Sequence, residues 1–235
     1  MARTPHSAWW WLSRALALVV LGFVLVQAWF AGMIVWYRYQ PPSRTAFMAE
    51  RLDELRARDP RATLQYRWVP YERISPNLKR AIIASEDARF LEHDGFDIEG
   101  MRRAFEKNSR RGKVVAGGST ITQQLAKNLF LSPSRSYARK AQEALIAVML
   151  EALLDKRRIL ELYLNVIEWG TGVFGAEAAA RHYDGIAAAQ LSAAQAARLA
   201  AMAPSPRRFE RNPRSAYLTG RTAAILARMP GTAFP

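Results

Sequence analysis

A long uncharged stretch near the N-terminus most constrains how this chain can fold. From Ala15 to Tyr37 no side chain is charged, and Gln27 is the one strongly polar residue. At about 1.5 Å of rise per residue, a helix of this length spans the roughly 30 Å hydrocarbon layer of a membrane. Aromatic residues gather at both of its ends, as expected at head-group depth: Trp9, Trp10, Trp11, Trp29, Trp36, Tyr37 and Tyr39.

This stretch predicts an uncleaved membrane anchor. A buried core helix is rarely uncharged over such a length, and a signal peptide has a shorter apolar region that ends in a small-residue cleavage site. More arginines follow the stretch than precede it, so counting basic residues slightly favours a cytoplasmic C-terminal side and does not settle the orientation.

The chain is strongly basic and contains no cysteine. Its 235 residues include 34 Lys and Arg against 20 Asp and Glu, a formal net charge of +14. Such an excess calls for an acidic partner, and nucleic acid, anionic lipid head groups and a phosphorylated substrate are the three candidates. The absence of cysteine excludes a disulfide scaffold, a zinc finger, an iron–sulfur site and a thiol nucleophile.

Apolar residues recur at helical spacing through most of the remaining chain, and period-two alternation is nearly absent. We therefore predict an all-α domain, with one short hairpin that the pattern does not locate. The predicted divisions are a short tail (1–14), the anchor (15–37), a juxtamembrane linker (38–68) and the domain (69–235). Capping signals and apolar spacing predict helices that begin at Ser75 and include Phe90, and others over about 97–107, 120–129, 134–154, 155–165, 176–183, 192–203 and 215–229.

Glu86 is the first candidate for chemistry. It lies four residues after Ile82 and four before Phe90, so on a continuous helix it shares their apolar face, to which His93 also returns. Burial on such a face disfavours the charged form of a carboxyl group, which suits a general base or acid. The alternative is a structural Glu hydrogen-bonded to His93 or to backbone, and the helix alone does not decide between them.

A second candidate is the polar segment 117–128. Two glycines precede a helix that opens with a Thr120–Gln123 capping box, which leaves backbone N–H groups free for a ligand. Many hydrogen-bonding side chains on one short helix suit a sugar or a phosphate, whereas a merely solvated face is usually richer in Glu and Lys. These side chains lie away from the apolar stripe of the helix: Thr122, Gln123, Gln124, Lys127 and Asn128.

The third candidate is Arg139-Lys140-x-x-Glu143. Taken alone, Arg139 and Glu143 form an ordinary helical ion pair. Taken with Glu86, a second carboxylate surrounded by cations suits a site that handles a phosphorylated leaving group.

Other motifs are set aside. The glycines of 170–175 match a dinucleotide fingerprint, but they follow a helical segment rather than a strand. There is no P-loop, no Ser has a Lys three positions later, and the three histidines are too scattered to predict a metal site.

In order, these segments resemble the peptidoglycan glycosyltransferases (glycosyltransferase family 51), specifically the monofunctional biosynthetic transglycosylases. The resemblance covers about Val69 to Met229, and Asp184 departs from it where the family usually has an aromatic residue. Five motifs carry it: Glu86-Asp87-x-x-Phe90-x-x-His93-x-Gly95; Gly118-Ser119-Thr120-Ile121-Thr122-Gln123-Gln124-Leu125-x-Lys127-Asn128; Arg139-Lys140-x-x-Glu143 with Leu150-Glu151; Lys156-x-x-Ile159-Leu160-Glu161-x-Tyr163-Leu164-Asn165; and Gly172-x-x-x-Gly175-x-x-x-Ala179-Ala180-x-x-Tyr183.

The resemblance implies a lysozyme-like helical fold and the polymerisation of lipid II into β-1,4-linked glycan with release of undecaprenyl diphosphate. Glu86 would be the base that removes a proton from the C4 hydroxyl of the acceptor's N-acetylglucosamine. The freed oxygen would attack C1 of the donor's N-acetylmuramic acid with inversion. Glu143 would orient basic groups, or a divalent magnesium or manganese ion, around the diphosphate, although no cofactor is required with certainty.

The resemblance also assigns binding roles. Lys127, Arg139 and Lys140 would neutralise the diphosphate, which makes a lipid diphosphate the expected acidic partner and removes nucleic acid. Ser119, Gln123, Gln124 and Asn128 would line the sugar and phosphate subsites. Segment 112–118, rich in glycine and basic residues, is a candidate for a mobile lip over the cleft.

The expected location is the bacterial cytoplasmic (inner) membrane, in a single pass, with a cytoplasmic tail and the catalytic domain facing the periplasm. Expected partners are lipid II, the growing lipid-linked glycan, and proteins of cell-wall synthesis or division; no transpeptidase activity is expected. Two alternatives remain. A lysozyme-like peptidoglycan-cleaving enzyme would need neither a cationic diphosphate cluster nor a permanent anchor, and in a non-catalytic membrane scaffold Glu86 and Glu143 would be ordinary residues.

Overall fold

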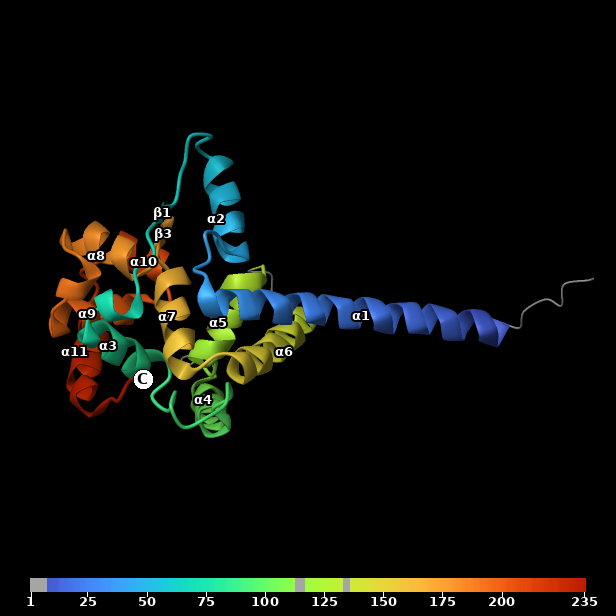
Figure 1. The fold of residues 1–235 in the computed structure, drawn as a ribbon. Coiled ribbons are helices and arrows are strands. Elements are labelled where there is room, and N and C mark those ends of the chain that lie inside the picture. Colours follow the sequence, from blue (N-terminus) through green and yellow to red (C-terminus); the bar gives the residue numbers. More distant parts are fainter. Residues whose placement is uncertain (1–7, 113–116, 133–135) are drawn as a thin grey trace, which may run out of the picture.

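The first helix, α1 (Ala8–Tyr39), projects from the rest of the chain as one long rod (Figure 1). The computed structural model describes residues 8–112, 117–132 and 136–235. Most of the described α1 side chains are exposed, although the 31 residues from Trp9 to Tyr39 are apolar enough to cross a membrane. An exposed apolar rod is consistent with the predicted membrane anchor, because a bilayer would cover the surface that the domain leaves bare.

Helices pack into the domain that follows, so the predicted all-α class is confirmed. Capping residues that the sequence indicates are found at Ser75, Asp97, Thr120 and Ser192, the last two within capping boxes. Short 3₁₀ turns lie at Tyr71–Arg73, Ala188–Gln190 and Met229–Gly231. The α-helices are α2 (Ala46–Arg56), α3 (Pro76–Glu86), α4 (Ile98–Arg111), α5 (Ile121–Phe130), α6 (Tyr137–Leu153), α7 (Lys156–Val166), α8 (Ala176–Asp184), α9 (Ala193–Met202), α10 (Pro206–Arg211) and α11 (Ala216–Arg228).

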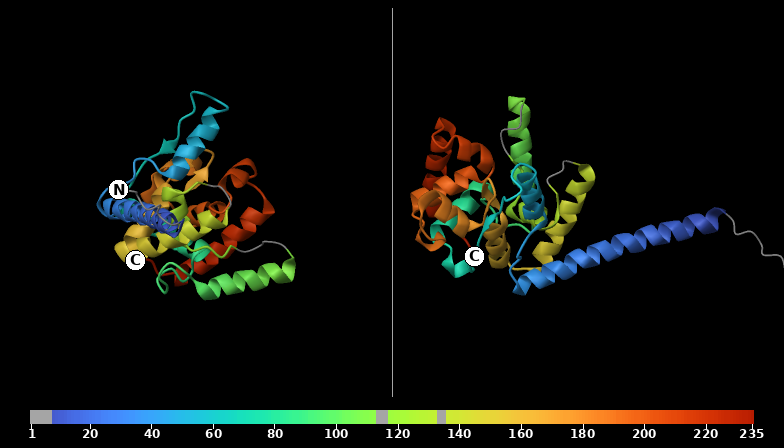
Figure 2. Two further views of the ribbon diagram at one scale, coloured as in Figure 1. Left: turned by 90° about the vertical axis from the view of Figure 1, so that its right-hand side faces the viewer. Right: turned by 90° about the horizontal axis from the view of Figure 1, so that it is seen from above.

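Helix α5 occupies the centre of this arrangement and packs against α2, α6 and α7. Its apolar residues Ile121, Leu125 and Leu129 are buried, as the stripe predicts. A second layer forms where α3, α9 and α11 pack together. Helices α2 and α4 project from different sides of the body (Figure 2). The polar side chains of α5 are therefore held in place by a helix that is packed on several sides.

A small three-stranded sheet contains the hairpin that the sequence could not locate. Strand β2 (Glu168–Gly170) pairs antiparallel with β3 (Val173–Phe174), and β1 (Gln65–Tyr66) adds parallel to β3. Gly172 has φ +73° in the hairpin turn. Gly175 has φ +84°, and a Cβ there would lie 2.6 Å from the Asn165 carbonyl oxygen. Turn geometry and close packing thus explain the glycines that mimic a dinucleotide fingerprint.

Several elements differ from the prediction. Helix α3 ends at Glu86 because Asp87 has the non-helical angles φ −159° and ψ 73°, so the expected continuation through Phe90 is wrong. Helix α4 extends to Arg111, beyond the predicted end at Lys107. Helix α10 was not predicted, since its short Pro206-led sequence carries no apolar stripe.

Candidate active site

Glu86 is the last residue of α3, and its side chain is 9% exposed. Its carboxylate accepts a hydrogen bond from Gln124 Nε2 of α5 (3.0 Å) and lies 3.1 Å from the Ser85 hydroxyl. The Arg221 guanidinium of α11 is 3.5 Å away. The alternative of a hydrogen bond to His93 is wrong, because α3 stops before the helix can bring His93 to the same face, and His93 pairs with Asp87. Glu86 is instead held by polar side chains from three helices.

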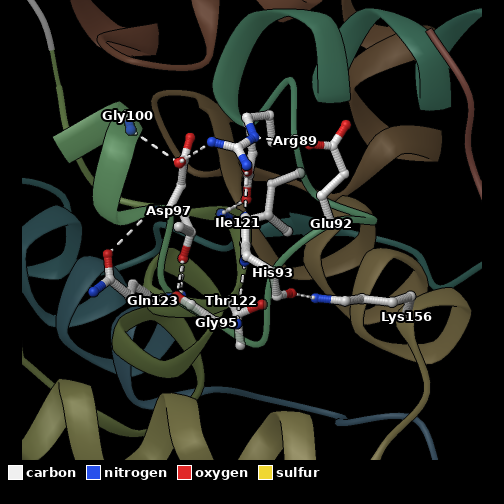
Figure 3. Close-up of polar contacts among 12 residues, drawn as sticks. Arg89, Glu92, His93, Gly95, Asp97, Gly100, Ile121, Thr122, Gln123 and Lys156 are labelled. Carbon is white, nitrogen blue, oxygen red and sulfur yellow. Dashed lines mark hydrogen bonds and ion pairs between the residues drawn. The ribbon is translucent and has the colours of Figure 1, made fainter. Parts of the chain in front are cut away.

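Asp87, the next residue, is the carboxylate that pairs with His93. Its Oδ1 lies 2.8 Å from His93 Nε2, and its Oδ2 accepts a hydrogen bond from the Ile121 backbone N–H at 3.0 Å. The Thr120 hydroxyl donates to the Gly95 carbonyl at 2.7 Å. Figure 3 shows how His93, Gly95 and Ile121 meet in this network. These bonds fasten the 87–97 loop to the start of α5, so they fix Glu86 relative to the polar residues of that helix.

Gln123 serves the same scaffold. Its side-chain oxygen accepts from the Thr120 backbone N–H at 3.1 Å, and the residue is buried. Lys156 adds a further link, because its ammonium group contacts the His93 carbonyl (Figure 3). The same ammonium group lies 2.9 Å from the Glu151 carboxylate. Gln123, which the sequence assigns to substrate contacts, is thus occupied by the capping box and does not line the cleft described below.

Glu143 of α6 is more deeply buried than Glu86, at 4% exposure of its side chain. Arg139 Nη1 lies 2.7 Å from one carboxylate oxygen, and Lys140 Nζ is in contact with the other. Lys140 Nζ also reaches the Ser119 hydroxyl at 3.3 Å. Within the described part of the chain, Arg139 Nε is buried without a hydrogen-bond partner, so this guanidinium retains an unused donor.

Lys127 lies between the two carboxylates. It lies three residues after Gln124 on α5, slightly less than one turn. No acidic side chain of the described residues lies within ion-pair distance of its ammonium group. Burial lowers the pKa of Lys127 below its ordinary value, with Arg139 and Lys140 lowering it further while Glu143 and Glu86 oppose them. A partly buried ammonium group without an ion-pair partner, beside other cations, is suited to an anionic ligand.

Tyr163 of α7 orients the Gln124 amide. Its hydroxyl donates to Gln124 Oε1 at 3.0 Å, which turns the amide nitrogen toward Glu86. Burial, with the carboxylates of Glu86 and Asp87 nearby, raises the pKa of Tyr163 well above its ordinary value, so the hydroxyl stays protonated. Asn128 Nδ2 donates to the Gln124 carbonyl at 2.7 Å on the same helix.

A cleft of about 800 Å³ brings several of these residues together. Of the predicted site, Gln124, Lys127, Asn128 and Arg139 line it; Glu86 and Glu143 are not among the lining residues, but they contact Gln124 and Arg139, respectively. The remaining predicted residues, Ser119 and Lys140, approach it only through the Glu143 cluster.

Arginines that the sequence analysis missed supply the facing wall. They come from α2, from the turn that follows it and from α10, and the Arg207-Arg208-x-x-Arg211 spacing is the signal that could have revealed some of them. Arg221 was missed as well, since nothing near it in the sequence connects α11 with Glu86. The wall arginines are Arg51, Arg58, Arg207, Arg208 and Arg211.

The divalent ion that the resemblance allows stays a prediction. Among the described residues no three His, Asp or Glu side chains form a group that could hold a metal, and both Glu143 oxygens already contact cations. Segment 112–118, the predicted lip, falls largely on residues 113–116, outside the described residues. Gly112 ends α4 with φ +61°.

Comparison with known proteins agrees with this geometry. The family described as Transglycosylase matches residues 53–230. Two biosynthetic peptidoglycan transglycosylases match over nearly their full lengths. The protein from Dechloromonas aromatica (strain RCB) is 58% identical over 95% of this chain and 99% of its own length. That from Laribacter hongkongensis (strain HLHK9) is 57% identical over 96% and 99%. The chain therefore belongs to the transglycosylase family, which confirms the recognition of a peptidoglycan glycosyltransferase.

Proposed function

We propose that this protein polymerises lipid II into β-1,4-linked glycan strands and releases undecaprenyl diphosphate. The transglycosylase family provides the reaction class, glycosyl transfer in cell-wall synthesis. The observation that carries the finer assignment is the arrangement of two carboxylates with different surroundings around one partly buried lysine, Lys127. Glu86 is held by amide and hydroxyl groups and by one guanidinium at 3.5 Å, whereas Glu143 is in closer contact with two cations.

Glu86 acts as the base in this proposal. It accepts the proton of the acceptor's 4-hydroxyl as the oxygen attacks C1 of the donor sugar, and the bond from C1 to the diphosphate oxygen breaks in the same displacement. One displacement inverts the anomeric configuration and requires no covalent enzyme intermediate. The hydrogen bonds from Tyr163 to Gln124 and from Gln124 to Glu86 aim the carboxylate and leave it free to take the proton.

Lys127 and Arg139 stabilise the leaving diphosphate. Charge develops on that group as the C1–O bond breaks, and cations already in place in a partly buried cleft stabilise it without reorganisation. Glu143 keeps Arg139 and Lys140 in position through its two ion pairs.

The cationic cleft also separates this activity from the lysozyme-like alternative. Hydrolysis of finished glycan requires a general acid and a water molecule, and it releases no diphosphate. A wall of arginines opposite Lys127 and Arg139 would serve no purpose in that reaction.

We further propose a single-pass location in the cytoplasmic membrane with the domain on the periplasmic side. The long apolar α1 supports the anchor, and a lipid-linked substrate explains the need for one. Proteins of cell-wall synthesis or division are the partners expected on this side. Reporters that work only in the periplasm, fused to each end of the chain, test the orientation. A periplasmic N-terminus would contradict it.

The activity is tested by incubating the purified full-length protein with labelled lipid II in one reaction and with preformed glycan in another. We expect polymer from lipid II and unchanged glycan. Shortened glycan would favour the hydrolase, and no turnover of either substrate would favour a scaffold.

A further inference from the structure

We propose that Gln27 of α1 and Gln142 of α6 form a contact that sets the depth of the catalytic cleft at the membrane surface. The proposal rests on the proposed function, because it assumes that the diphosphate to be bound is carried by a membrane lipid. It assigns a positioning role to the one strongly polar residue of the anchor. Gln27 does not touch the reacting groups.

The last third of α1 belongs to the domain rather than to a free anchor. Phe30, Ile34 and Tyr37 are buried there, and Gln27 is partly buried. Their spacing of three, four and three residues places all four on one face of the helix. Trp29, on a neighbouring face, remains exposed. Figure 1 shows α6 beside the domain end of α1, where this face docks.

Hydrogen bonds hold the docked segment at both ends. Gln27 Nε2 donates to Gln142 Oε1 at 3.1 Å, and Gln142 Nε2 donates back to Gln27 Oε1 at 2.9 Å. At the other end the Arg158 guanidinium donates to the Tyr37 carbonyl at 2.8 Å through Nε. This bond satisfies a carbonyl that the end of α1 leaves without a helical partner.

Aromatic packing fills the space between these two ends. The ring of Phe130, the last residue of α5, lies 5.4 Å from that of Phe30 and 5.9 Å from that of Tyr37. Helix α1 is therefore joined to α5, α6 and α7, of which α5 and α6 carry the proposed diphosphate-binding residues.

The length of α1 agrees with this division. At about 1.5 Å per residue, the 31 residues from Trp9 to Tyr39, which include Arg14 and Arg38 near the two ends, extend roughly 46 Å, about 16 Å more than the hydrocarbon layer. The docked segment from Gln27 to Tyr37 is about 15 Å long, which accounts for the excess. The segment from Trp9 to Gln27 is about 28 Å long, so it alone nearly spans the layer. Gln27 then lies at the boundary between hydrocarbon and head groups.

Gln142 connects the position of α1 in the membrane to the proposed diphosphate-binding residues of α6. It directly precedes Glu143 and follows Arg139 by three residues, so all three lie within about one 5.4 Å turn of α6. An amide buried against apolar surface is costly unless its hydrogen bonds are made. Sliding or rotating α1 by one residue would unpair both amides, so the pair fixes one register. In that register the cationic turn of α6 lies at the level of lipid head groups.

The first test compares bilayers with detergent micelles. Full-length protein carrying Gln27→Leu or Gln142→Leu is assayed for lipid II polymerisation in both, with Val26→Leu as the matched control because it introduces the same side chain on the lipid-facing side. Without the Gln27–Gln142 pair, fewer molecules hold the cleft at the depth that lipid II binding requires, and the apparent KM rises accordingly. We expect a rise of about three- to five-fold in liposomes, the size of one interhelical hydrogen bond, with kcat nearly unchanged.

In micelles, which impose no bilayer plane, the KM values of these variants should approach those of the unaltered protein. An equal rise in micelles and liposomes would indicate a folding defect and overturn the positioning role, as would no rise in either. If the unaltered protein makes no polymer in either medium, the proposed function fails instead. The two failures are therefore distinguishable.

The second test is a disulfide cross-link between two introduced cysteines. The chain contains no cysteine of its own, so no native thiol can compete. A variant with Gln27→Cys and Gln142→Cys should form an intramolecular disulfide in liposomes, whereas one with Leu25→Cys and Gln142→Cys should not. Oxidation should also restore the KM that the reduced double variant has lost. Absence of the cross-link, or loss of polymerisation when it forms, would contradict a docked anchor during catalysis.

Discussion

Replacing Glu143 with Gln is predicted to destabilise the domain far more than the same change at an exposed carboxylate. The Glu143 side chain is 4% exposed, while its partners Arg139 and Lys140 are 17% and 47% exposed. Removing one member of a fully buried ion pair costs about 3–5 kcal/mol, because the remaining charge is left uncompensated. Lys140 can turn to solvent, so we expect the cost to lie near 2–4 kcal/mol.

Glu99 of α4 provides the control. It also pairs with two arginines, Arg89 and Arg103, but its side chain is 69% exposed. Exposed pairs contribute about 0–1 kcal/mol, so Glu99→Gln should scarcely change stability. For a domain of this size, 2–4 kcal/mol corresponds to a fall of roughly 4–16 °C in Tm. Thermal unfolding of both variants in detergent measures the difference, and equal shifts in Tm would refute the assignment of Glu143 as a buried counter-charge.

Three further predictions concern charge and packing. Burial lowers the pKa of Lys127, so kcat/KM for lipid II should begin to fall at a lower pH than the ordinary lysine pKa of 10.5 would give. In Lys127→Arg this fall should move to higher pH, because arginine stays protonated. A fall that does not move would belong to another group. Gly175→Ala should lower Tm markedly, since φ is +84° and the added Cβ meets the Asn165 carbonyl at 2.6 Å; an unchanged Tm would mean that the backbone relaxes freely. Arg208→Gln with Arg211→Gln should raise the KM for lipid II while leaving Tm within about 1–2 °C, because both side chains are exposed in the cleft wall; a KM equal to that of the unaltered protein would exclude this wall from binding.

Much of the fold follows from local signals. Four helix N-termini are predicted correctly, because each depends on a side chain that accepts a hydrogen bond from a backbone N–H two or three residues later. Their capping residues are Ser75, Asp97, Thr120 and Ser192. Polar residues clustered within one or two turns, such as Arg139 and Glu143, are also found together in the folded chain.

The errors arise where distant residues decide the structure. Helix α3 ends at Glu86 because Asp87 turns to bond the Ile121 N–H, a partner 34 positions away. No local pattern reveals that contact. The same holds for Arg221, 135 positions from Glu86. For Gln27, the sequence marks the residue as unusual but gives no indication of its partner 115 positions away.

The most direct test of the proposed mechanism is the rate of lipid II polymerisation by Glu86→Gln. The substitution keeps the shape of the side chain and removes its ability to accept a proton, and general-base catalysis contributes about 10²–10⁴-fold to rate. We predict a loss of that size, with lipid II binding and the helical circular dichroism spectrum unchanged. Polymerisation at the rate of the unaltered protein, in a variant of confirmed sequence, would contradict the assignment of Glu86 as the base.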